Sequence, residues 1–179
     1  MSKLLQLVSM LLLPLEACAE LPRPDEGRAP TRGAETSPVP RSRPLPSDSP
    51  VQLARSVHEK INAYRIAQGL ESLELHESLN RLAQEHSAEM ASHGVPLGHE
   101  GFGDRAQAIR KVFPYSRLAE NVGYNWGMAD PVADAVARWL RSPQHRDNVI
   151  GDFESTGVGV VRNERGEYYF TQIFLDVRD

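Results

Sequence analysis

The hydrophobic pattern of this chain changes its period once, and this change restricts the possible folds more than any other feature. In several segments between Ser49 and Ser142, apolar residues recur every three or four positions, as on one face of an amphipathic helix. From Thr156 to Phe174, β-branched and aromatic residues form two runs around the polar turn at 163–166, a pattern typical of a β-hairpin. Helices followed by an antiparallel hairpin predict an α+β fold with helices packed on a small sheet.

Helix-terminal residues set the limits of the predicted elements. Ser49 and Gln52 form a capping box, Pro50 suits the first helical position, and Gly69 can end the first helix. The predicted helices span about 49–69, 77–92, 104–112 and 130–142. A shorter strand is expected over 120–125, and a new short helix is expected to carry His145.

The first 19 residues have the pattern of an export signal. A short positive start precedes the apolar run LLQLVSMLLLPL, which is shorter than the roughly 20 residues that cross a bilayer as a helix. Ala17-Cys18-Ala19 provides a cleavage site after Ala19. Residues 15–18, LEAC, also resemble a lipobox, in which Cys18 would carry a lipid anchor. Cys18 either leaves with the signal or anchors the chain, and in both cases the folded part has no cysteine to form a disulfide.

A change of composition separates this signal from the folded part. Residues 20–50 hold eight of the 13 prolines and no aromatic residue, so they cannot bury enough apolar surface to offset chain entropy. We therefore expect a disordered Pro-rich tether over 20–47 and one domain over 48–179. That domain has 14 Lys and Arg against 19 Asp and Glu, a formal charge of −5. A net-acidic domain without a basic stripe argues against nucleic acid as a partner.

Four of the six histidines have ordinary structural interpretations. His86 lies on the apolar stripe of the second helix and is expected to be a core histidine with one satisfied nitrogen. His58 and His76 have no polar neighbours in sequence and are expected at the surface. His93 precedes Gly94, where a polar or cationic side chain suits the helix C-terminus.

The other two histidines, with one glutamate, are candidate site residues. His99 lies in a Gly-rich loop and is followed by Glu100, and His145 follows a Ser-Pro turn. Glu120 leads into a strand, where an unpaired buried carboxylate would be costly. Two imidazoles and a carboxylate are suitable ligands for Zn²⁺ or another divalent cation, with one coordination position left open.

Five segments resemble those of bacterial CAP domains, the superfamily of cysteine-rich secretory proteins, antigen 5 and plant pathogenesis-related proteins. In chain order they are HSAEMASHGVPLGHEGF, LAENVGYN, VARWLRSPQHRDNVI, TGVGVV and YYFTQIF. The resemblance implies a secreted three-layer α-β-α sandwich whose cleft contains His99, Glu120 and His145. The second glutamate of the animal and plant members has no counterpart between Trp139 and His145, and Glu100 could replace it.

The resemblance also implies roles for residues around the cleft and a set of possible functions. Trp139, Asn121 and Asn148 are expected to support the cleft. The favoured function is a secreted or surface-tethered module that binds a divalent metal, a lipid, a peptide or a cell-wall component, with membrane contact only through Cys18. The alternatives are a metal-dependent hydrolase with Glu120 as general base, and a cleft whose polar network is purely structural.

Overall fold

The structure, a computed structural model, describes residues 49–177 of the chain. The predicted export signal over 1–19 and the predicted tether over 20–47 lie outside the described residues. The elements are α1 (Pro50–Ala67), β1 (Glu74–Leu75), α2 (Glu77–Ala91), α3 (Phe102–Arg110), β2 (Tyr115–Trp126), α4 (Pro131–Arg141), α5 (Pro143–Ile150), β3 (Ser155–Arg162) and β4 (Glu167–Val177). The predicted α+β class is confirmed. No helix within 49–177 is both long and apolar enough to span a bilayer.

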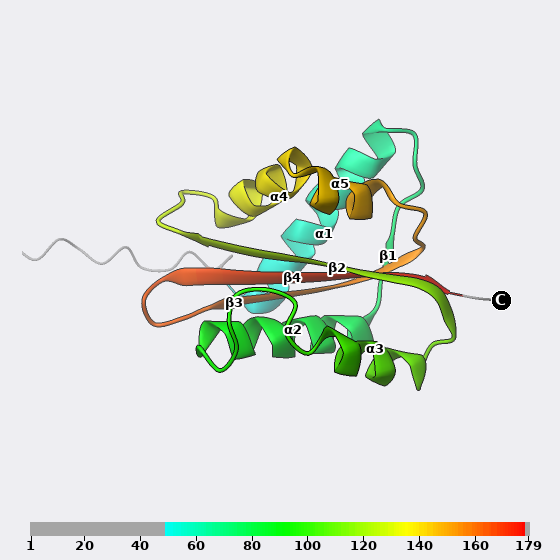
Figure 1. The fold of residues 1–179 in the computed structure, drawn as a ribbon. Helices are drawn as coiled ribbons and strands as arrows, with labels where there is room; N and C mark the ends of the chain where they lie inside the picture. The colour runs from blue at the N-terminus through cyan, green and yellow to red at the C-terminus, as the bar shows by residue number, and fades with distance from the viewer. Residues whose placement is uncertain (1–48, 178–179) are drawn as a thin grey trace, which may run out of the picture. The chain divides into compact units, whose positions relative to one another are not determined.

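The described domain has three layers, with the sheet in the middle. Helices α1, α4 and α5 cover one face of the sheet, and α2 and α3 cover the other (Figure 1). The strand order is β1-β3-β4-β2, and β3, β4 and β2 pair antiparallel as predicted. The two-residue β1, which is too short to show a sequence pattern, adds a parallel pairing with β3.

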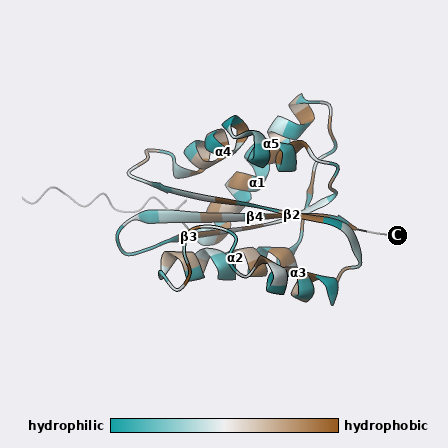
Figure 2. Cartoon of the chain, in the orientation of Figure 1, coloured by the Kyte–Doolittle hydropathy of each residue, from teal (hydrophilic) through white to brown (hydrophobic). Residues whose placement is uncertain are grey.

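The central strand β4 divides the core into its two halves. Phe170 and Phe174 pack against α1 and α4, whereas Ile173 and Leu175 pack against α2 and α3. This alternation follows from the two-residue period of a strand. In Figure 2, hydrophobic residues lie along the strands and on the helix faces next to them. Each of these fully buried side chains stabilises the fold by about 1.5–3 kcal/mol.

Two glycines of β3 allow α2 to lie directly on the sheet. A Cβ at Gly157 would come within 2.2 Å of a backbone atom of Leu79, and one at Gly159 within 2.2 Å of a backbone atom of Ala83. No side chain larger than hydrogen fits at this distance. The glycines in TGVGVV are therefore required by the packing of the helix on the strand.

Several local predictions need correction. Helix α2 ends at Ala91, and His93, with φ of 59°, takes a left-handed conformation just after it. Strand β2 extends well beyond 120–125. His58 is not a simple surface residue, because its Nε2 lies 2.9 Å from the Leu73 carbonyl oxygen.

Candidate functional site

The loop before α3 presents His99 at the surface, and a buried histidine of α2 contacts the backbone of this loop. As predicted, His86 is buried, and its Nε2 lies 2.8 Å from the carbonyl oxygen of Gly98, the residue before His99. Gly101, with φ of 72°, takes a left-handed conformation and opens α3. His99 therefore projects from a loop whose backbone is held at both ends, and about half of its side chain is exposed.

Glu120 forms the buried centre of the site. Its side chain is 1 % exposed and is held by Arg105 of α3, whose Nε donates to Oε2 and Nη2 to Oε1, both at 2.8 Å. The third guanidinium nitrogen, Nη1, donates to the Glu100 carbonyl oxygen at 2.8 Å. Such a two-bond arginine–carboxylate pair is among the strongest polar contacts in proteins. Sequence reasoning did not identify Arg105, although the cost of burying Glu120 indicated that it needs a cationic partner.

Glu120 also orients His99. Nδ1 of His99 lies 3.0 Å from Oε1 of Glu120. An ionised carboxylate only accepts hydrogen bonds, so Nδ1 carries the proton and donates it. In the neutral form of the ring, this tautomer has its lone pair on Nε2.

Helix α5 carries His145 and is joined to β2 by the side chains of Asn121 and Asn148. Asn121 of β2 donates through Nδ2 to the His145 carbonyl oxygen at 3.0 Å. Asn148 donates through Nδ2 to Asn121 Oδ1 at 2.9 Å and to the Glu120 carbonyl oxygen at 3.4 Å. The side chains predicted to support the cleft thus connect α5 to β2.

The His145 ring has its own local partner. Its Nδ1 lies 2.9 Å from Ser142 Oγ. Burial lowers the pKa of the His145 imidazole below its ordinary value of 6.5, and the neighbouring His99 lowers it further. His145 is therefore neutral at physiological pH, with Nε2 available if Nδ1 donates to the serine.

Trp139 is buried in the core, whereas Glu100 lies at the surface. Trp139 is 2 % exposed and donates through Nε1 to the Val122 carbonyl oxygen of β2 at 3.0 Å. Its ring also packs against Gly123. Glu100 is exposed, and its contact with Arg105 uses the backbone carbonyl.

Two hollows adjoin this network. One, of about 230 Å³, is lined by His99, Glu120 and Asn148 among others. The other, of about 350 Å³, is lined by residues including Trp139 and His145. The described residues contain no group of three or more His, Cys, Asp or Glu side chains placed to hold a metal ion. That a metal ion is bound directly by His99, Glu120 and His145 stays a prediction. To bind the metal, Glu120 would have to give up its hydrogen bonds to Arg105.

Comparisons with known proteins agree with the fold. The sequence model of the cysteine-rich secretory protein family, CAP, matches residues 58–174. An outer surface protein of Borrelia burgdorferi is similar in structure, with a TM-score of 0.62 and 20% identity over 75% of this chain and 97% of that one. A search of curated protein sequences finds no match.

Two further bacterial structures are longer than this chain. A cysteine-rich secretory protein of Staphylococcus aureus has a TM-score of 0.59 and 25% identity, over 73% of this chain and 40% of that one. An extracellular SCP-domain protein of Bacillus anthracis has a TM-score of 0.58 and 26% identity, over 75% and 45%. The chain thus spans less than half of these two proteins. Because the family model covers more than half of the sequence, the chain belongs to the cysteine-rich secretory protein family.

Proposed function

We propose that this chain is an exported CAP-domain protein that binds a divalent transition-metal ion, such as zinc, through Nε2 of His99 and Nε2 of His145. One observation carries the proposal. Each ring has its Nδ1 engaged by a neighbour, whereas within residues 49–177 neither Nε2 has a hydrogen-bond partner. The rings are also close enough for His99 to lower the pKa of His145.

The partners of the two Nδ1 atoms are those that metal-binding histidines use. A histidine ligand usually donates its second N–H to a carboxylate, a carbonyl or another oxygen, which fixes the ring and makes the free nitrogen a better ligand. Glu120 fits this role for His99, and Ser142 fits it for His145. Since two side chains leave coordination positions open, zinc here would supply a Lewis acid accessible to water or to an extracellular ligand.

Glu120 then acts as a positioning residue and not as a ligand or a general base. Arg105 occupies both of its carboxylate oxygens, and His99 shares one of them. These bonds use three of the roughly four acceptor sites of the carboxylate, and its side chain is 1 % exposed, which leaves little access for the water whose proton a general base would take. The geometry therefore favours the binding module over the hydrolase.

Export of the chain is part of the same proposal. The pattern of residues 1–19 supports it, with a lipid anchor at Cys18 as an open alternative. Two of the similar structures are described as an outer surface protein and an extracellular protein. A lipid, peptide or cell-wall component is the kind of ligand that such a protein would meet.

Zinc titration calorimetry at neutral pH tests the metal site. The wild type should bind zinc saturably, and His99→Ala and His145→Ala should each abolish the binding while their zinc-free forms stay folded. His76→Ala is the matched control, because this ring contacts Phe113 away from the cleft and its loss should leave zinc binding unchanged. Absence of saturable heat with folded wild type would refute the metal site. Melting temperatures that fall in both cleft variants without zinc would then assign the histidines to a structural network.

A further inference from the structure

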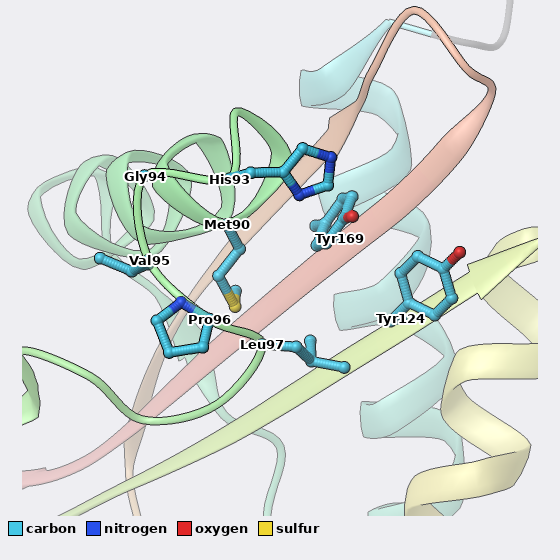
Figure 3. A pocket seen from close by; sticks show the side chains of 8 residues that line it. All are labelled: Met90, His93, Gly94, Val95, Pro96, Leu97, Tyr124 and Tyr169. Atoms are coloured by element: carbon cyan, nitrogen blue, oxygen red, sulfur yellow. The ribbon is translucent and has the colours of Figure 1, made fainter.

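A third hollow lies between the C-terminal end of α2, the C-terminal end of β2 and the N-terminal end of β4. This tyrosine groove has a volume of about 410 Å³, and its apolar lining residues are Met90, Val95, Pro96, Leu97, Tyr124 and Tyr169. Figure 3 shows the Tyr124 and Tyr169 rings on one side and the loop of residues 95–97 on the other, with His93 above Tyr169. Neither the cleft histidines nor Glu120 lines this groove.

Three aromatic rings meet here at steep angles. The Tyr124 and Tyr169 centroids are 5.2 Å apart with planes inclined at 63°, and those of His93 and Tyr169 are 6.4 Å apart at 80°. The faces of tyrosine rings carry partial negative charge, so Tyr124 and Tyr169 favour a cation in the space beside them. Tyr124 is 37 % exposed, which leaves part of this surface free for a ligand.

A carboxylate strengthens the negative character of the two tyrosine rings. The Tyr124 hydroxyl donates to Glu167 Oε1 at 3.1 Å, and the Tyr169 hydroxyl lies 3.5 Å from Glu167 Oε2. Asn163 donates to the same carboxylate, and this bond lowers the pKa of Glu167, which keeps it ionised at neutral pH. A phenol that donates to an anion gives electron density to its ring, which improves the ring as a partner for a cation.

We propose that the tyrosine groove binds an organic ammonium group of the quaternary type, as in choline. The aromatic faces and the ionised Glu167 suit its charge, whereas Leu97, Pro96 and Met90 suit its methyl groups. The lining residues include no lysine or arginine that would occupy the groove in its place. The ammonium group comes either from a free solute or from the headgroup of a zwitterionic lipid.

Arg165 is a nearby cation that opposes such a ligand. It is exposed, and its charge contributes to the lowered pKa of Glu167. Its removal should strengthen ammonium binding, while removal of a groove tyrosine should weaken it. Two opposite effects on one ligand distinguish this site from unspecific apolar binding.

Calorimetric titration of the full chain with choline and with tetramethylammonium tests the proposal. Both should bind saturably, whereas 3,3-dimethylbutan-1-ol, the neutral isostere of choline, should bind at least about tenfold more weakly, because it lacks the cation–ring attraction. Vesicle sedimentation then separates the two sources. Preference for phosphatidylcholine over phosphatidylglycerol vesicles assigns the lipid headgroup, and choline binding without that preference assigns a free solute.

Matched variants locate the site. Tyr124→Leu should weaken choline binding about five- to thirtyfold, and Arg165→Gln should strengthen it about two- to fivefold. Tyr168→Leu is the control, because this ring stacks on Phe170 at the opposite face of the sheet and should leave binding unchanged. The proposal is overturned if folded wild type binds neither ammonium ion, if the neutral isostere binds equally well, or if Tyr124→Leu and Tyr168→Leu behave alike. None of these results bears on zinc binding in the cleft.

Discussion

Replacing Arg105 by methionine should destabilise the domain far more than the loss of an ordinary arginine on a helix. The Glu120 side chain is 1 % exposed, and that of Arg105 is 9 % exposed. The substitution removes two hydrogen bonds to the carboxylate and one to the Glu100 carbonyl, and it leaves a buried charge with His99 as its remaining side-chain partner. Removing one partner of a buried ion pair costs about 3–5 kcal/mol, and we expect a loss in this range.

Equilibrium unfolding in urea, followed by far-ultraviolet circular dichroism, measures this loss. Arg110→Met is the matched control on the same helix, because Arg110 is exposed and its contact is the Tyr115 ring at 4.3 Å. It should cost at most about 1 kcal/mol. The double variant Arg105→Met with Glu120→Leu should recover at least about 2 kcal/mol relative to Arg105→Met, since no buried charge remains. If Arg105→Met costs no more than Arg110→Met, the ion pair does not hold the site.

Two further predictions concern the protonation of His145 and the packing of α2 on β3. The pKa of His145 is lower in the folded chain than in the unfolded chain. As the pH drops below about 6.5, the imidazole is therefore protonated first in the unfolded chain, and the stability of the fold should fall. His145→Gln should reduce this slope in thermal melts between pH 7 and pH 5. Gly159→Ala places a Cβ 2.2 Å from a backbone atom of Ala83 and should cost about 3 kcal/mol or more in urea unfolding. Gly103→Ala, where the Cβ meets open space in a helix, should instead be neutral or stabilise by up to about 1 kcal/mol; equal costs at the two glycines would refute the packing argument.

The elements of the fold could be predicted where local chemistry determines them. Ser49 and Asp130 cap α1 and α4 through their side chains, as such residues do at helix starts. The hairpin of β3 and β4 follows from its two-residue period and its turn. The parallel pairing of β1 could not be predicted, because two residues carry no period and the pairing depends on where α1 and α2 place them.

The sequence predicted three polar side chains of the candidate site but not the contacts between them. His99, Glu120 and His145 were chosen as candidates from the sequence itself, and the resemblance to CAP domains agreed with the choice. The structure places Glu120 beside His99 and His99 near His145. Arg105 was missed because the sequence of a short helix does not show which of its charged residues turns inward. The need of a buried Glu120 for a cation was evident, but the many arginines of the domain gave no means of choosing one.

The tyrosine groove was missed for a related reason. Tyr124 and Tyr169 are 45 positions apart in the sequence and face each other only through the register of β2 and β4. Glu167 joins them because it lies two positions from Tyr169 on the same face of the strand. Such a cluster arises from strand pairing, for which the sequence gives no local signal.

The position of zinc in a zinc-soaked crystal, located by anomalous diffraction at the zinc edge, shows directly whether the two cleft histidines hold the ion. We expect an ion about 2.0–2.1 Å from Nε2 of His99 and from Nε2 of His145. Arg105 should keep both of its bonds to Glu120, and water or another small ligand should complete the coordination. An ion bound directly by a Glu120 oxygen with Arg105 displaced, or no zinc at either ring, would contradict this expectation.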